Sequence, residues 1–340
     1  MIFWVEVSQK IGMGHFKEAI FLSDHFNNPS VHFIIPPYLP AELELKKKKI
    51  SYSIMDINNY ENIIHLIKKI SKKKCIIINH RNVSLKALET LRRENCLVAV
   101  IDQLGGKQII CDLLINKSIV SEWLKYDFVK DKPVCCFGAD YAILEDCYEE
   151  LHKREKKFTK TNYTILVSMG GVDRTGSTLR IIKALQSIDN TSKEIIIGNG
   201  FSHIDKLHNL RKKLNDSSFI FSQGVDDLGK RMSKADIVIS AGGNTVYEMA
   251  CVGTPGIVLW EDEHEYIQGK IFSERRTLLC LGNGIKTPIE LISNSIKVLL
   301  KDVNQRKNMS QCGKKLVDFH GKKRIVDELY ELIKRNFDSD

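Results

Sequence analysis

The fold class of this chain can be inferred from ISAGGNTVYEMACVGTP, residues 239–255. This stretch opens as an apolar strand that ends at Gly242 and Gly243, and the helical pattern that follows stops at Gly253 and Pro255. A strand, a glycine turn and a helix in this order are typical of parallel sheets whose strands are connected by crossover helices. The stretch therefore predicts an α/β fold.

The same alternation continues in both directions along the 340 residues. In the first half, strands are expected at residues 2–7, 31–35, 50–55, 75–79, 97–102 and 113–116. In the second half, strands are expected at residues 163–168, 194–197, 219–221, 237–240, 256–260 and 277–281. Helical spacing of apolar residues fills the intervals, including residues 16–25, 59–73, 85–93, 177–186, 225–233 and 245–252.

A charged stretch, EELHKREKKFTK at residues 149–160, separates two α/β halves of comparable length. A chain of this length is long enough to form two domains, each with a core of its own. We therefore expect two facing Rossmann-like domains, residues 1–150 and 151–340, with parallel sheets and a ligand cleft between them at the carboxyl ends of the strands. The terminal helix is expected to pack back on the N-terminal domain.

The composition is that of an ordinary soluble protein, with 43% hydrophobic and 27% charged residues. No apolar run approaches the ~20 residues of a membrane span, and the N-terminus lacks a signal-peptide pattern, so we expect a cytoplasmic protein. The nine cysteines form no C-x-x-C pair, which favours reduced, buried thiols. The net charge of +9 comes without a basic stripe interleaved with aromatic residues, so we expect an anionic small substrate and no nucleic acid.

The loop that follows the strand in the opening stretch carries the strongest binding signal. Gly242, Gly243, Asn244 and Thr245 can present backbone N–H groups to a diphosphate at the start of a helix. Glu248, on the first turn of that helix, is placed to accept hydrogen bonds from ribose hydroxyls. A glutamate near a helix N-terminus is also favoured by the helix dipole without any ligand, so that alternative stays open.

Two further glycine turns lie between an expected strand and a helix. In QKIGMGHFKEA, residues 9–19, Gly12, Gly14 and His15 form a turn that suits an anion, or only a tight bend with a capping histidine. A dinucleotide fingerprint would need a glycine where Lys17 stands.

The other turn is SMGGVD, residues 168–173, with Gly170 and Gly171. Its Asp173 could hold a sugar hydroxyl, or could cap the helix that follows.

The segment WEDEHEYIQ, residues 260–268, contains side chains that could bind a metal ion. His264 and Glu265 form half of a zinc-peptidase motif, but Gln268 stands where the second histidine would be, so a zinc peptidase is not expected. The neighbouring carboxylates could hold magnesium or calcium, and a solvated acidic loop is the favoured alternative. We predict no metal site and no cofactor.

Read together and in order, the turns resemble a known family. The chain resembles the nucleotide-sugar hydrolases of the pseudaminic acid pathway and their relatives in spore-coat polysaccharide synthesis, which share the GT-B fold of the MurG-type glycosyltransferases. The similar segments are IGMGH, AVIDQLGGKQIICDLLIN (99–116), FGADYAIL (137–144), ILVSMGGVD (165–173) and SAGGNTVYE (240–248). They cover about residues 1–285.

The resemblance implies which residues meet the substrate. UDP would lie in the C-terminal domain on residues 242–245 with Glu248 at the ribose, while the sugar would face His15. In the hydrolases the histidine of this motif helps water to displace UDP from the anomeric carbon, and His15 has that position. The remaining residues on the sugar side would be Gly12, Gly14, Asn79, His80, Arg81, Gly170, Gly171, Asp173, His264 and Glu265.

Several positions on the sugar side differ from the family pattern. The arginine three residues after the histidine is Glu18 here, and an aspartate of the family is Gln103. The usual Asp-His-Tyr is Asn79-His80-Arg81, and the usual Asn-Gln is His264-Glu265. Because arginine offers a fixed charge and several donors, we expect Arg81 to bind a carboxylate or phosphate of the ligand.

The leading functional prediction is a hydrolase that attacks a UDP-sugar with water at the anomeric carbon and releases UDP. Such a reaction would serve the biosynthesis of a bacterial nonulosonic acid or of a surface or flagellar glycan. The first alternative is a GT-B glycosyltransferase, for which an acceptor would be a further partner. The second is a sugar-nucleotide-binding protein without catalysis.

Overall fold

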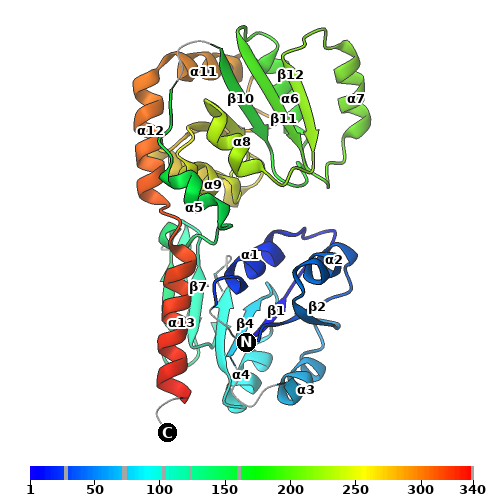
Figure 1. Cartoon of the computed structure of the whole chain (residues 1–340), viewed down its shortest axis with the longest axis vertical. Coiled ribbons are helices and arrows are strands. Elements are labelled where there is room, and N and C mark those ends of the chain that lie inside the picture. The colour runs from blue at the N-terminus through cyan, green and yellow to red at the C-terminus, as the bar shows by residue number, and fades with distance from the viewer. Residues whose placement is uncertain are drawn as a thin grey trace. The chain divides into compact units, whose positions relative to one another are not determined.

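The computed structural model describes residues 1–26, 30–70, 75–101, 105–106, 108–121, 124–158 and 162–337. The chain divides into two compact units. The first comprises Met1–Glu145 and the segment from His320 onward, and the second comprises Asp146–Phe319. Each unit contains a parallel sheet with helices packed on it (Figure 1).

The first unit is built on a seven-stranded sheet in the order β3-β2-β1-β4-β5-β7-β9, in which every neighbouring pair is parallel. Its strands are β1 (Ile2–Val5), β2 (His32–Ile35), β3 (Ser51–Ile54), β4 (Cys75–Asn79), β5 (Leu97–Ile101), β7 (Leu113–Asn116) and β9 (Val134–Phe137). A separate parallel pair is formed by β6 (Gln108–Ile109) and β8 (Asp127–Phe128). Because the chain builds outward from β1 to β3 and resumes at β4 on the other side of β1, the strand order reverses between β1 and β4.

Both faces of this sheet are buried apart from the edge strand β3, whose residues are exposed or half-buried, which explains why most of its strands are almost continuously apolar. Phe3 and Val5 of β1 enter one core with α1 and α13, whereas Ile2 and Trp4 point to the opposite face and enter a second core with α3 and α4. The helices of this unit are α1 (Gly14–Ser23), α2 (Leu39–Lys48), α3 (Tyr60–Ile70), α4 (Leu85–Arg93) and α13 (Gly321–Phe337), with a 3-10 turn η2 (Ala139–Tyr141).

The second unit is built on a six-stranded parallel sheet in the order β12-β11-β10-β13-β14-β15. Its strands are β10 (Tyr163–Ser168), β11 (Thr191–Ile197), β12 (Phe219–Gln223), β13 (Ile237–Ser240), β14 (Gly256–Trp260) and β15 (Leu279–Asn283). Its helices are α5 (Cys147–Lys153), α6 (Ser177–Leu185), α7 (Ile204–Lys213), α8 (Leu228–Lys234), α9 (Thr245–Val252), α10 (Glu263–Glu274), α11 (Ile289–Lys301) and α12 (Val303–Leu316). Here the strand order reverses between β10 and β13.

The prediction of two Rossmann-like α/β halves with parallel sheets is confirmed. The helix predicted at 245–252 has the bounds of α9, and the strand predicted at 163–168 has those of β10. The strand at 134–137, VCCF, was not predicted, and it has a single β-branched residue. The expected ends of the strand 97–102, the helix 59–73 and the linker 149–160 reach beyond the described residues.

Two structural boundaries differ in position from those of the predicted domains. The first unit ends at Glu145, and α5 occupies the first part of the charged stretch that was predicted as a linker. The chain returns to the first unit at His320, and the buried Ile325 and Leu329 of α13 lie in its core. Over the part of the chain that the structure describes, no helix combines the length and the apolar character needed to cross a membrane.

Candidate functional site

In each unit the predicted glycine turns follow the strands at the point where the strand order reverses. Ligands of open parallel sheets bind at this point, outside the carboxyl ends of the strands. In the first unit, β1 leads to Glu6 and the turn before α1, and β4 ends at Asn79 and leads to Arg81. In the second unit, Gly170 follows β10 and Gly242 follows β13.

The turn before α1 requires its first glycine. Gly12 has φ +81°, donates its N–H to the carbonyl of Ser8 at 2.7 Å, and pairs with Ser8 in an isolated bridge. α1 then begins at Gly14, and Met13 at its N-cap makes no side-chain hydrogen bond to the helix. His15 therefore lies on the first turn, and its ring is not the cap that the alternative interpretation expected.

The ring of His15 is buried and bonded to Arg81. Its Nε2 accepts a hydrogen bond from Nε of Arg81 at 2.9 Å, and its backbone carbonyl accepts one from Nδ2 of Asn79 at 3.0 Å. His15 is 7% exposed, and its Nδ1 has no hydrogen-bond partner among the described residues. Burial lowers the pKa of His15, and the charge of Arg81 acts in the same direction. His15 is therefore neutral near pH 7.

Three other groups at this edge of the sheet have structural partners. Glu6 is buried, and its Oε2 accepts the backbone N–H of Arg81 at 3.1 Å. His80 stacks on the ring of Trp4, with the ring centroids 5.8 Å apart. Arg81, expected to bind a ligand, contacts His15 in this structure.

Glu18, which replaces an arginine of the family pattern, forms an ion pair with Lys117 directly after β7. Both side chains are 5% exposed. Removing one member of such a buried pair leaves an uncompensated charge, so Glu18 and Lys117 depend on each other. Gln103, the other departure at this edge, lies outside the described residues.

In the second unit, the turn after β10 is followed by a carboxylate that caps α6. Gly170 has φ +82°, and the carbonyl of Gly171 accepts the N–H of Gly200 at 2.9 Å. Asp173 accepts the N–H of Ser177 at 2.8 Å and that of Thr178 at 3.0 Å. Of the two roles considered for Asp173, the structure shows the helix cap, and a sugar contact stays a prediction.

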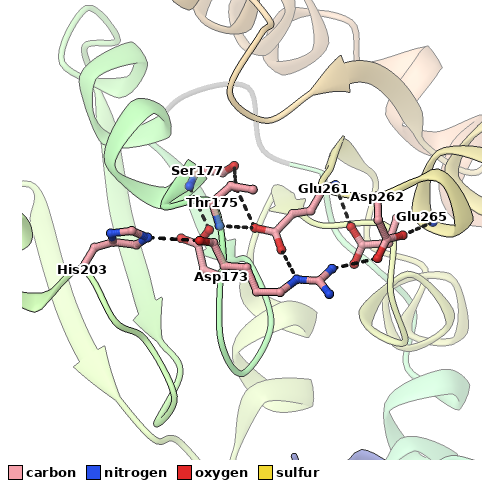
Figure 2. A network of polar contacts seen from close by, with 8 residues as sticks. Asp173, Thr175, Ser177, His203, Glu261, Asp262 and Glu265 are labelled. Carbon is pink, nitrogen blue, oxygen red and sulfur yellow. Dashed lines mark hydrogen bonds and ion pairs between the residues drawn. The ribbon is translucent and has the colours of Figure 1, made fainter. Parts of the chain in front are cut away.

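The acidic segment after β14 is tied to this capping turn (Figure 2). Glu261 accepts the backbone N–H of Thr175 at 3.2 Å and its hydroxyl at 2.8 Å, and both Glu261 and Asp262 pair with Arg174. Asp262 also caps α10 by accepting the N–H of Glu265 at 3.0 Å. Within the described ranges, no three His, Cys, Asp or Glu side chains gather as metal ligands would.

The turn Gly242-Gly243 is held from its carbonyl side by Gln268. Nε2 of Gln268 donates to the carbonyls of Gly242 and Gly243, and its Oε1 accepts the hydroxyl of Tyr247 at 2.7 Å. In a trans peptide the N–H points opposite to the C=O, so these bonds turn the N–H groups of Gly243 and Asn244 away from Gln268. Asn244 at the N-cap of α9 makes no side-chain cap bond. Such a helix start is suited to an anion.

Two glutamates adjoin this turn. Glu248 lies on the first turn of α9 and is half-buried. Glu265 accepts the backbone N–H of Glu261 at 2.8 Å, and burial raises the pKa of its carboxyl to about 7. His264 is exposed at the start of α10. In the sequence, Gln268 was considered only because it stands where a zinc-binding histidine would be. Its contact with the glycine turn was not predicted. The one available signal was its spacing of four residues from His264, which places it one turn further along α10.

The structure thus gathers the predicted residues into two sets. Gly12, Gly14, His15, Asn79, His80 and Arg81 lie around the reversal point of the first unit. The set in the second unit comprises Gly170, Gly171, Asp173, Gly242, Gly243, Asn244, Thr245, Glu248, His264 and Glu265.

The comparison with family models covers the second set of residues. Residues 164–325 match the model of the glycosyltransferase family 28 C-terminal domain. The matched region begins in β10 and ends in α13, so it contains both glycine turns of the second unit and the acidic segment.

Two relatives align over most of the chain. The chain is 25% identical over 265 residues to the uncharacterized protein MJ1062 of Methanocaldococcus jannaschii, covering 75% of the chain but only 54%, about half, of that relative. It is 24% identical over 284 residues to the spore coat polysaccharide biosynthesis protein SpsG of Bacillus subtilis, covering 81% of the chain and 82% of SpsG. The predicted similarity to spore-coat relatives is confirmed.

Solved structures establish the fold. MurG of Acinetobacter baumannii superimposes with a TM-score of 0.67 at 14% identity, covering 97% of this chain and 99% of MurG. Spinosyn rhamnosyltransferase SpnG, complexed with thymidine diphosphate, gives a TM-score of 0.64 at 12% identity, covering 97% of this chain and 99% of SpnG. The chain therefore has the predicted GT-B fold. At such identities the likeness concerns the fold, and the reaction is argued from the residues.

Proposed function

We propose that this chain is a GT-B glycosyltransferase that binds a nucleoside diphosphate sugar and transfers the sugar to an acceptor. The observation that carries the proposal is the match of residues 164–325 to a glycosyltransferase C-terminal domain, with the Gly242-Gly243 turn inside it. The similarity to a spore coat polysaccharide biosynthesis protein supports a role in making a glycan. The nucleotide is UDP, as the motif resemblance implies.

The nucleotide site proposed for the second unit rests on the turn before α9. Gln268 directs the N–H groups of Gly243 and Asn244 away from itself, and the start of α9 adds the positive end of the helix dipole. These groups together suit the diphosphate. Glu248, on the first turn of the same helix, accepts the ribose hydroxyls in this proposal.

The catalytic role proposed for the first unit belongs to His15. A neutral imidazole takes a proton from the attacking hydroxyl, and burial keeps His15 neutral near pH 7. The acceptor oxygen then bonds to the anomeric carbon, and the bond from that carbon to the diphosphate breaks with its electrons on UDP.

Transfer replaces hydrolysis as the leading function. Hydrolysis and the pseudaminic acid pathway rest on the motif resemblance alone, and none of the comparisons reported above supports them. The same histidine would serve water or an acceptor hydroxyl, so the choice depends on the domain match. The cytoplasmic location stays a prediction.

The first test separates nucleotide binding from turnover. By calorimetry, Glu248→Ala weakens UDP binding by about 10- to 100-fold, because hydrogen bonds to a charged group contribute ~1.5 to 3 kcal/mol. Glu290→Ala is the matched control, since Glu290 also lies on a first helical turn of the second unit but is exposed at the start of α11. His15→Ala keeps the UDP affinity and lowers turnover by ~100- to 10,000-fold.

Turnover is followed as UDP release from UDP-glucose and UDP-N-acetylglucosamine, with and without added sugar acceptors. Faster release with an acceptor, together with a glycosylated product, supports transfer. Equal release in water alone indicates a hydrolase. Tight UDP binding without release from any donor indicates a binding protein, and failure of the wild type to bind UDP refutes the proposed function.

A further inference from the structure

Arg81 is hydrogen-bonded to Nε2 of His15, the ring nitrogen that would accept a proton if His15 acted as a base. Because arginine stays charged and only donates, its bond to Nε2 at 2.9 Å requires that Nε2 be the acceptor atom of a neutral ring. The proton of the neutral ring then sits on Nδ1. Nε2 in this state cannot take a proton from a substrate hydroxyl, since its lone pair is already engaged.

Four charged groups face the ring of His15 from different elements. The carboxylates are Glu6 after β1 and Glu18 on α1, and the cations are Arg81 after β4 and Lys117 after β7. Glu18 and Lys117 form a buried ion pair with each other, and Glu6 accepts the backbone N–H of Arg81. Only Arg81 among these four donates to the ring nitrogen itself.

The backbone and the side chain of Arg81 are held by different contacts. The backbone N–H is fixed on the buried Glu6 at 3.1 Å, whereas Arg81 as a residue is exposed. The guanidinium can therefore exchange its hydrogen-bond partner while β4 and the residues that follow it stay in place. His15 cannot follow such a movement, because it is buried and its carbonyl is bonded to Asn79.

We propose that Arg81 binds an anionic oxygen group of the acceptor, a phosphate or a carboxylate, and that this exchange releases Nε2 of His15. An anionic group adds the attraction of opposite charges and can accept two parallel hydrogen bonds from the guanidinium, whereas Nε2 of the neutral imidazole accepts one, so an anionic group competes with the imidazole for Arg81. A neutral acceptor offers no such exchange. Arg81 is thus a positioning residue that couples recognition of the acceptor to the availability of the base.

The released nitrogen then takes the proton of the acceptor hydroxyl. That O–H bond breaks, the oxygen bonds to the anomeric carbon, and the bond between this carbon and the diphosphate breaks with its electron pair on UDP. The proposal rests on the transferase function proposed above, and it names the acceptor class as anionic.

The test observes His15 directly and needs no acceptor. In the full-length chain labelled with nitrogen-15 at histidine, NMR spectra at pH 7 report which ring nitrogen carries the proton, and His15→Gln identifies the signals. The wild type alone gives the form with the proton on Nδ1 and with Nε2 hydrogen-bonded. Inorganic phosphate and acetate are the two probes, one for each kind of anionic group.

We expect phosphate, acetate or both to change the Nε2 signal of the wild type, and the probe that acts identifies the group. Arg81→Ala shows the released signal without any anion, and its response to the active probe is weaker by about 10- to 100-fold. The matched control is Arg93→Ala, because Arg93 is an arginine of the same unit with a side chain 77% exposed on α4. We expect Arg93→Ala to give the same His15 signals as the wild type, with and without the anions.

A second readout is the pH dependence of UDP release. Loss of the Arg81 charge raises the pKa of His15, so the acidic limb of the profile moves to higher pH in Arg81→Ala. The proposal is overturned if neither anion alters the His15 signals of the wild type, or if Arg81→Ala responds like the wild type. Failure of UDP to bind would refute the transferase function but would leave the NMR result unchanged, so the two failures are distinguishable.

Discussion

At the scale of single residues, Glu265 links the acidic segment to the Gly242-Gly243 turn. Burial raises the pKa of its carboxyl from 4.5 to about 7, so between these values the folded chain binds a proton that the unfolded chain does not. The free energy of unfolding therefore decreases as the pH rises through this window. Glu265→Gln removes the titration, and above pH 7 we expect it to be more stable than the wild type by about 1 to 3 kcal/mol.

Chemical denaturation at pH 5 and pH 8 measures this difference. Glu263→Gln is the matched control, because Glu263 is exposed on the first turn of the same helix, α10. A variant Glu265→Gln that loses as much stability as the wild type between the two pH values contradicts the role of burial at Glu265.

Single residues also mark how far the sequence could predict the site. Asp173 and Glu248 were found from their places beside glycine turns, but a carboxylate at a helix start can cap, bind or do neither. Only the structure shows that both oxygens of Asp173 accept backbone N–H groups. The contact of Arg81 with His15 joins residues 66 positions apart, which no local pattern reveals.

At the scale of elements, the two glycines of the turn before α9 differ in their packing, because Gly242 lies against α10 and Gly243 does not. A Cβ on Gly242 would lie 2.8 Å from Cβ of Glu265 and still closer to its carbonyl oxygen, so the backbone would have to shift. A Cβ on Gly243 would meet nothing closer than 3.5 Å. We expect Gly242→Ala to lower the free energy of unfolding by about 1 to 3 kcal/mol and to weaken UDP binding.

Gly243→Ala is the control for this pair, and its stability is expected within about 0.5 kcal/mol of the wild type. Thermal unfolding and calorimetry with UDP compare the two variants. Equal effects of the two substitutions would show that close packing on α10 does not determine the shape of the turn.

The predictability of elements follows the same physics. α9 and β10 were located because glycine and proline signals mark their ends: Gly253 and Pro255 follow α9, and Gly170 follows β10. The two-residue strands β6 and β8 carry too few residues for a period to show.

At the scale of the whole molecule, the chain crosses between its units twice, because α13 joins the core of the first unit after the second unit is complete. A helical period shows which face of a terminal helix is apolar but not which sheet that face meets, so local sequence patterns alone do not place α13. The buried residues of α13 in that core are Ile325, Val326, Leu329 and Leu332.

The same arrangement predicts which unit a change in α13 weakens. Leu329 is fully buried in the core of the first unit, so Leu329→Ala should lower the stability of that unit by about 2 to 5 kcal/mol. Hydrogen exchange read by mass spectrometry checks this: exchange should rise in β1 and α1 and stay unchanged in β10 and β13. Glu331→Ala, at an exposed position two residues further along α13, should leave both units unchanged. Faster exchange in β13 than in β1 for Leu329→Ala would mean that α13 stabilises the second unit instead, and the division of the chain described above would then be wrong.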